Sequence, residues 1–306
     1  MIDAVLEIFH DYTFQVVALG SAMLGVISGV LGSFAVLRKQ SLLGDCVSHS
    51  ALPGVVLAFL TTGEKNGGIL LLGALISGFL SAGIVTLIGR HSKVKADAAQ
   101  AIVLSVFFGL GMALLMFSQN LPNANQAGLK RFIYGQASTM RRGDVVLMLI
   151  VGGILIGTVV LLWKEFLLFT FDSAYGETIG FSSAKINAIL TFLIVCAILI
   201  GLQTVGVILM SAMLITPAVA ARQWTNRLPK MVALAAVFGA AAGVGGTLIS
   251  SIVPEMPTGP VIVVCVSAIA VFSVFFAPRR GILARLIERA RFRSQLRGYS
   301  DRKSVV

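Results

Sequence analysis

The sequence predicts an all-α, polytopic integral membrane protein with about nine transmembrane helices. Hydrophobic residues make up 57% of the 306 residues and charged residues only 12%, and the mean hydropathy is +0.94. The uncharged residues fall into long runs, and the Lys and Arg residues lie between them. This composition is typical of membrane proteins and excludes a water-soluble enzyme.

The transmembrane segments follow from the uncharged runs. There are eight of them, at 12–37, 46–63, 66–89, 98–129, 145–163, 186–221, 231–254 and 256–278. A helix needs about 20 apolar residues to cross roughly 30 Å of hydrocarbon, so most runs hold one crossing. As a single helix, run 186–221 would extend about 54 Å. Gly201, Gln203, Thr204 and Gly206 favour a turn near its middle, which gives nine helices.

The distribution of basic residues predicts the orientation. Acidic residues precede the first run instead of the basic region of a signal peptide, so we expect that run to be retained as a helix. With the C-terminus cytoplasmic and the N-terminus outside, 19 of the 24 Lys and Arg residues lie on the cytoplasmic side. This agrees with the excess of Lys and Arg that cytoplasmic loops carry. The exceptions are Lys65, Lys130, Arg131, Arg141 and Arg142. We expect Arg131–Thr139 to form a short interfacial or re-entrant piece.

The chain divides into a transmembrane domain, residues 1–278, and a basic cytoplasmic tail, residues 279–306. We expect an amphipathic helix after Gly281 that lies on the anionic inner leaflet, where each basic residue contributes about 1 kcal/mol. Nucleic acid is the other partner that such charge suggests. No stacking platform or recognised fold accompanies the charge, so we expect lipids and no nucleic acid.

One ionisable pair, Asp45 and His49, falls within a predicted helix. A spacing of four residues puts both side chains on one helix face, where they can meet on one ion. Pro53 lies on the same helix face, and because it has no N–H it leaves one backbone carbonyl without a donor. Ionisable groups inside a membrane normally face a polar path or a partner. Cys46 points about 100° away from Asp45 and is expected to pack against a neighbouring helix.

Three interpretations of the pair stay open. His49 either hydrogen-bonds Asp45 and steadies helix packing, or both residues relay protons, or both bind a passing divalent metal ion. Oxygen and nitrogen ligands suit manganese, iron(II) and zinc better than copper(I). The other histidines, His10 and His91, lie at predicted helix ends and are expected to be solvated.

The source of energy lies outside the chain. No GxxxxGK[ST] motif occurs, so the chain is not expected to hydrolyse nucleotide. An ion gradient or a second subunit must supply the energy. In the inner loop at 171–183, Asp172 fits a helix N-cap and Gly180 a C-cap about two turns later. A short capped helix there is either a docking element or a plain connection.

Three stretches resemble the membrane permease of the manganese/zinc/iron ABC importers, the ABC-3 family. Leu37–Gly54, with its Gly-Asp, a His four residues later and a Leu-Pro-Gly, is similar to the signature of the second helix. Val205–Arg222 resembles a late helix with a Pro-Ala segment, and Phe171–Ser183 resembles the coupling loop. The helix number agrees as well, so the resemblance covers nearly the whole chain.

The resemblance implies that Asp45 and His49 line the metal path. It implies that Asp172, Gly176, Glu177 and Gly180 sit in a groove of a cytoplasmic ATP-binding subunit. It further implies a second permease copy, an extracytoplasmic metal-binding lipoprotein or periplasmic protein, and a place in the bacterial plasma membrane. Metal ions would be substrates, manganese or iron ahead of zinc, and no permanent cofactor is expected.

The chain departs from the family pattern at three positions. Ala174 stands where an acidic residue is common, Gly176 where Ala is common, and Cys46 where a small apolar residue is usual. Two rival functions stay open: a gradient-driven secondary transporter and a membrane scaffold that does not transport. One ionisable pair is few for the first, and the second leaves that pair unexplained.

Overall fold

The computed structural model describes residues 10–63, 67–119, 140–202, 206–253, 256–278 and 281–284, and every element in these ranges is helical. The elements are α2 (Tyr12–Leu37), α3 (Leu43–Thr62), α4 (Gly67–His91), α5 (Ala96–Gln119), α7 (Arg142–Leu161), α8 (Trp163–Phe171), α9 (Ser173–Thr178), α10 (Ser183–Leu202), α11 (Val207–Trp224), α12 (Leu228–Ile252) and α13 (Thr258–Phe276). The predicted all-α class is confirmed.

Eight helices in the described residues are long and apolar enough to span a membrane, close to the nine expected. Run 186–221 divides as predicted, because α10 ends at Leu202 and α11 begins after Gly206, whose φ of 88° favours glycine. The helix α11 forms but is not one of the eight spans.

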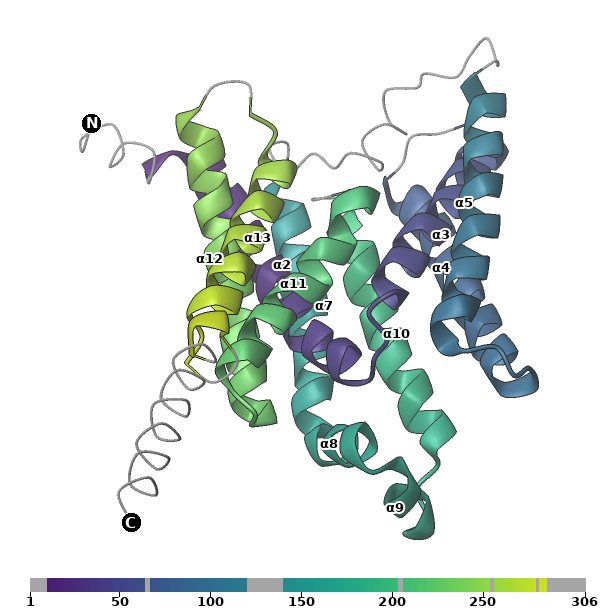
Figure 1. Cartoon of the computed structure of the whole chain (residues 1–306). Helices are drawn as coiled ribbons and strands as arrows, with labels where there is room; N and C mark the ends of the chain where they lie inside the picture. The colour runs from purple at the N-terminus through teal and green to yellow at the C-terminus, as the bar shows by residue number, and fades with distance from the viewer. Residues whose placement is uncertain are drawn as a thin grey trace, which may run out of the picture.

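Helix α2 is the centre of the bundle. It packs against α7, α10, α11 and α12, and most of its length is buried. Figure 1 shows α12 and α13 on one side of it and the group formed by α3, α4 and α5 on the other. The short helices α8 and α9 lie together at one end of the bundle. The predicted pieces Arg131–Thr139 and the tail beyond residue 284 lie outside the described residues.

Small residues let α2 approach α12 closely. A Cβ atom at Gly25 would overlap the backbone of Gly239, and one at Gly239 would overlap the backbone of Gly25. The same holds for Gly29 against the Ala235 carbonyl. Membrane helices gain no hydrophobic driving force against lipid, so such backbone contact is a main source of their association.

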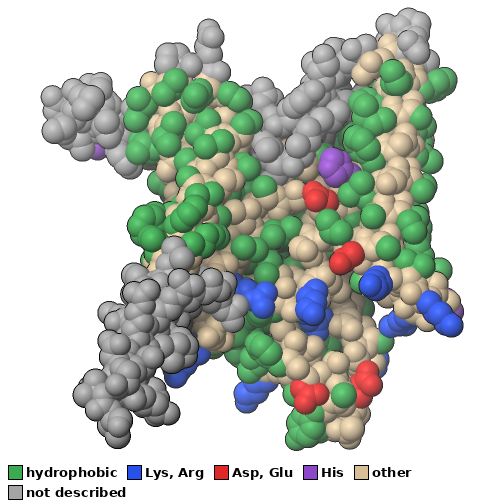
Figure 2. Space-filling model, viewed as in Figure 1, with side chains coloured by type: hydrophobic (Ala, Val, Ile, Leu, Met, Phe, Trp, Pro, Cys, Tyr) green, Lys and Arg blue, Asp and Glu red, His purple; other side chains and the backbone are tan. Residues whose placement is uncertain are grey.

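On one face of the molecule, basic side chains gather toward one end. Figure 2 shows the Lys and Arg residues on this face gathered toward the end that holds α8 and α9.

At the N-terminal end of α7, Arg142 lies over the Tyr12 ring, 4.4 Å from its centroid, and the Asp144 carboxylate accepts a hydrogen bond from the Arg141 amide. Two basic residues that the charge rule assigned to the outer side are thus held at a helix end.

The glycine contact predicts the effect of adding one methyl group. Gly239→Ala forces the backbones of α2 and α12 apart and should lower the melting temperature of the detergent-purified protein, because overpacking costs about 1 to 3 kcal/mol. Gly245→Ala on the same helix is the matched control, since a Cβ there meets no atom within 4 Å. It should leave the melting temperature unchanged or raise it. Equal stability of the two variants would contradict the proposed packing.

Candidate functional site

A tight turn between α2 and α3 positions the two candidate residues, Asp45 and His49. Lys39 takes a φ of 58°, the one positive φ of a non-glycine residue in the described ranges, and the Gln40 amide donates back to the Ala35 carbonyl. The chain therefore reverses within a few residues, and α3 starts partway along the bundle. In Figure 1 its first turn lies farther from α9 than the beginning of α10 does.

Asp45 and His49 lie on consecutive turns of α3, and both side chains are half-buried. Asp45 falls in the first turn of the helix, where the helix dipole favours a negative charge. No hydrogen bond or ion pair joins the two side chains, and the buried Nδ1 atom of His49 has no hydrogen-bond partner among the described residues. The first interpretation, a mutual hydrogen bond that steadies packing, therefore has no support in the geometry.

Helix α5 supports the pair from one side. The Phe108 ring meets the His49 ring edge-on, with centroids 4.9 Å apart. Farther along α3, a Cβ atom at Gly111 would come within 2.9 Å of Pro53, so the two helices nearly touch there. Neither α5 residue carries a charge or a motif, and sequence reasoning did not identify them. Phe108 thus contributes a ring contact to the position of the imidazole.

Cys46 points away from the pair, as the helical spacing predicted. It is fully buried in a small apolar cluster with Val85 of α4 and with Ala99 and Val103 of α5. A thiol held in this way packs as a small apolar group. Its position excludes it from a shared site with Asp45 and His49 in this conformation.

The donor set at the pair is small and mixed. No group of three His, Cys, Asp or Glu side chains close enough to hold a metal occurs in the described part of the chain. Asp45 offers carboxylate oxygen and His49 imidazole nitrogen. Pro53 has no N–H, so the carbonyl of His49, four residues earlier, lacks its usual helical donor. Two side chains and one free carbonyl suit an ion that keeps part of its water shell and is released again.

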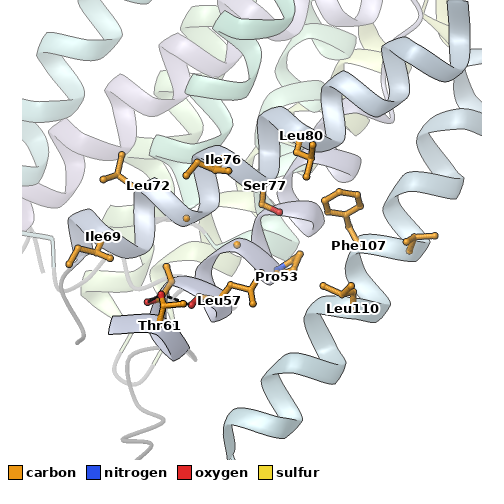
Figure 3. A pocket seen from close by; sticks show the side chains of 14 residues that line it. Pro53, Leu57, Thr61, Ile69, Leu72, Ile76, Ser77, Leu80, Phe107 and Leu110 are labelled. Atoms are coloured by element: carbon orange, nitrogen blue, oxygen red, sulfur yellow. Dashed lines mark hydrogen bonds between the residues drawn. The ribbon is translucent and has the colours of Figure 1, made fainter. Parts of the chain in front are cut away.

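A cavity of about 540 Å³ lies between α3, α4 and α5 but does not include the pair. Figure 3 shows its lining, which is almost entirely apolar. Its two hydroxyl groups are already engaged: Ser77 donates to the Ser50 carbonyl and Thr61 to the Leu57 carbonyl. The cavity therefore offers no free polar group to an ion.

The second candidate region forms the predicted capped helix. Asp172 is the N-cap of α9, and its Oδ1 atom accepts a hydrogen bond of 2.9 Å from the Tyr175 amide. Gly180 follows the helix with a φ of 96°, and its amide donates to the Glu177 carbonyl. The predicted N-cap is therefore present, whereas the C-cap is Ile179 and Gly180 follows it by one position.

One side of α9 is fixed to the bundle, and the rest is exposed. Gly176 is buried against the Phe169 ring of α8, where a Cβ would come within 2.7 Å. Glu177 is exposed, and so are large apolar side chains around it: Phe171, Tyr175, Ile179 and Phe181. Exposed apolar side chains at the basic, aqueous end of a membrane protein indicate a surface that a partner covers.

A chain of aromatic contacts links this surface to α2. The Phe34 ring of α2 lies 5.8 Å, centroid to centroid, from both Trp163 and Phe166 of α8. The next turn of α2 ends at Arg38, whose guanidinium donates a 2.6 Å hydrogen bond to the Asn187 side chain of α10. Burial of the Arg38 guanidinium lowers its pKa from the usual value. The end of α2 that leads into α3 is thus held by both α8 and α10.

Comparison with known proteins identifies the family. The model of the ABC 3 transport family matches residues 10–277. The zinc transport system membrane protein TroC of Treponema pallidum (strain Nichols) is 51% identical over 94% of this chain and 97% of its own length. The manganese transport system membrane protein MntC of Bacillus subtilis (strain 168) is 48% identical over 94% of this chain and 66% of its own length.

A solved structure agrees with the fold. PsaBC from Streptococcus pneumoniae, in complex with a Fab, has a TM-score of 0.79 and 30% identity and covers 92% of this chain and 98% of its own. The sequence relatives and the solved structure therefore match nearly the whole length of this chain. The chain is a multi-pass membrane permease and belongs to the ABC 3 transport family.

Proposed function

We propose that the chain is the permease of an ATP-binding cassette importer that carries a divalent metal ion past Asp45 and His49. The pair carries the proposal: a carboxylate and an imidazole lie on one face of α3, bonded neither to each other nor to another described side chain. Ionisable groups without a structural partner inside a membrane are expected to serve the transported species.

The donor atoms favour manganese or iron(II), with zinc next. Carboxylate oxygen, imidazole nitrogen and a carbonyl are acceptable to all three ions, and no thiolate reaches the pair. The names of relatives point to the same ions, since TroC is named for zinc and MntC for manganese. We propose that Asp45 and His49 replace part of the water shell of the ion and release it inward.

ATP hydrolysis belongs to a separate cytoplasmic subunit in this proposal. The exposed part of α9, with Asp172, Glu177 and Gly180, would be its docking element, and the contact of Gly176 with Phe169 would pass its movement to α8. The basic residues at this end support a cytoplasmic position, with the N-terminus outside. An extracytoplasmic binding protein and a second permease copy would complete the importer in the bacterial plasma membrane.

The proposal predicts complete dependence of transport on the pair. Asp45→Ala and His49→Ala should each abolish ATP-dependent uptake of radioactive Mn²⁺ into cells or vesicles, because each removes one of two side-chain ligands. Cys46→Ala is the matched control, since its side chain is buried on the other face of the same turn. It should keep uptake within about twofold of the wild type. Normal uptake by either site variant would disprove the assignment.

Docking through α9 predicts a second, separable effect. Gly180→Val strains a backbone of φ 96° and should distort the end of α9, so that the ATP-binding subunit no longer co-purifies. Gly63→Val is the matched control, because Gly63 also has a positive φ, 66°, and a Val there is strained as well. Gly63 is the C-cap of α3 and lies at the opposite end of the bundle from α9. This control variant should retain the subunit. Loss of the subunit in both variants, or in neither, would contradict the docking role.

A further inference from the structure

We propose that Gln100 of α5 is a selectivity residue on the ion path, with its amide oxygen facing the ion or its bound water one turn inward of Asp45. This inference rests on the proposed transport of a metal ion past α3. It adds a helix to the path and a chemical preference among the candidate ions, and neither follows from the pair alone.

Gln100 is unusually buried for its helix. Most of α5 is exposed, whereas the Gln100 side chain is only 2% exposed. Its Oε1 atom is buried and has no hydrogen-bond partner in the described structure. Ser118, the other buried polar side chain that could compete for such a role on α5, donates to the Leu115 carbonyl and is satisfied. A buried amide oxygen without a donor costs free energy, so a donor or a cation is expected to reach it in some state.

The register of the two helices places Gln100 on the face of α5 that meets α3, near the start of α3. Helices α3 and α5 run in parallel: Cys46 packs against Leu104, the His49 ring meets Phe108, and Gly111 faces Pro53. Gln100 precedes Leu104 by four residues and therefore lies on the same stripe of α5, one turn nearer the cytoplasmic end. Along α3 this level lies just inward of Asp45.

A second buried polar atom without a partner lies where α3 meets α5. The Nδ1 atom of His49 is also buried and has no hydrogen-bond partner among the described residues. Together with Gln100 it gives two unsatisfied polar atoms where α3 meets α5. Buried polar atoms without a partner are expected where a hydrated ion passes, because the water on the ion can bridge to them.

The amide oxygen gives the path a chemical preference. Amide and carboxylate oxygens suit harder ions such as Mn²⁺, whereas imidazole serves Zn²⁺ at least as well. With Asp45, Gln100 would make the inward side of the path an oxygen-rich site. Removal of this oxygen is expected to weaken Mn²⁺ transport more than Zn²⁺ transport, and a purely structural role for Gln100 would affect the two ions equally.

The test compares the two ions in the assembled importer, reconstituted in vesicles with its ATP-binding subunit and binding protein. Gln100→Leu removes both amide groups, Gln100→Glu keeps an oxygen, and Ser118→Ala is the control on the same helix. Gln100→Leu is expected to raise the half-saturating Mn²⁺ concentration about tenfold or more. Mutation of residues that support metal ligands usually has an effect of this size. The value for Zn²⁺ should change less than about threefold, and Gln100→Glu should stay close to the wild type for Mn²⁺.

The inference is overturned if Gln100→Leu leaves both values unchanged or shifts them by the same factor. Should Gln100→Leu fail to assemble, the same ratio is measured for Gln100→Ala, and equal shifts have the same meaning. Parallel measurements on His49→Ala separate the two proposals. Transport lost in His49→Ala but unchanged in Gln100→Leu removes only the role of Gln100, whereas normal transport in His49→Ala removes the proposed function itself.

Discussion

The free energy needed to hold a carboxylate and an imidazole inside a membrane is the constraint around which this chain is organised. Helix α3 meets that constraint by packing against α4, α5, α10 and α11. Asp45 gains from the dipole of the first turn, and His49 packs against the Phe108 ring while its Nδ1 atom has no hydrogen-bond partner in the described structure. The pair is therefore held in place by packing, and its polar atoms stay available to a transported ion.

The position of α3 depends in turn on α2. Glycines let α2 lie against the backbones of α11 and α12, and the sharp turn at Lys39 then fixes where α3 begins. The same end of α2 touches α8 through Phe34, and α8 touches α9 through Phe169. One continuous set of packed contacts thus connects the exposed surface of α9 with the helix that carries the pair. Such a connection is what coupling between ATP hydrolysis and ion movement would require.

Local patterns in the sequence were enough to predict the long helices, the division of run 186–221, and the N-cap of α9, but not the short helix α8. Asp172 and Gly180 act through their own backbone neighbourhood, so their roles follow from nearby residues. The partners of His49 and the burial of Gln100 depend on how α3 meets α5. Contacts between helices far apart in the sequence leave no local pattern in a single sequence. An uncharged Gln within an apolar run likewise matches no motif that would indicate a functional residue. The metal-binding role of Asp45 and His49 itself stays a prediction.

The most direct test is an anomalous difference map, measured at the manganese absorption edge, of crystals of the assembled importer grown with Mn²⁺. A peak within ligand distance of both the Asp45 carboxylate and the His49 imidazole is the result that the account predicts. Absence of this peak from crystals of the His49→Ala variant would show that the ion is bound through His49. A peak bounded by other membrane residues, with no density at the pair, would contradict the central claim that the ion crosses along α3.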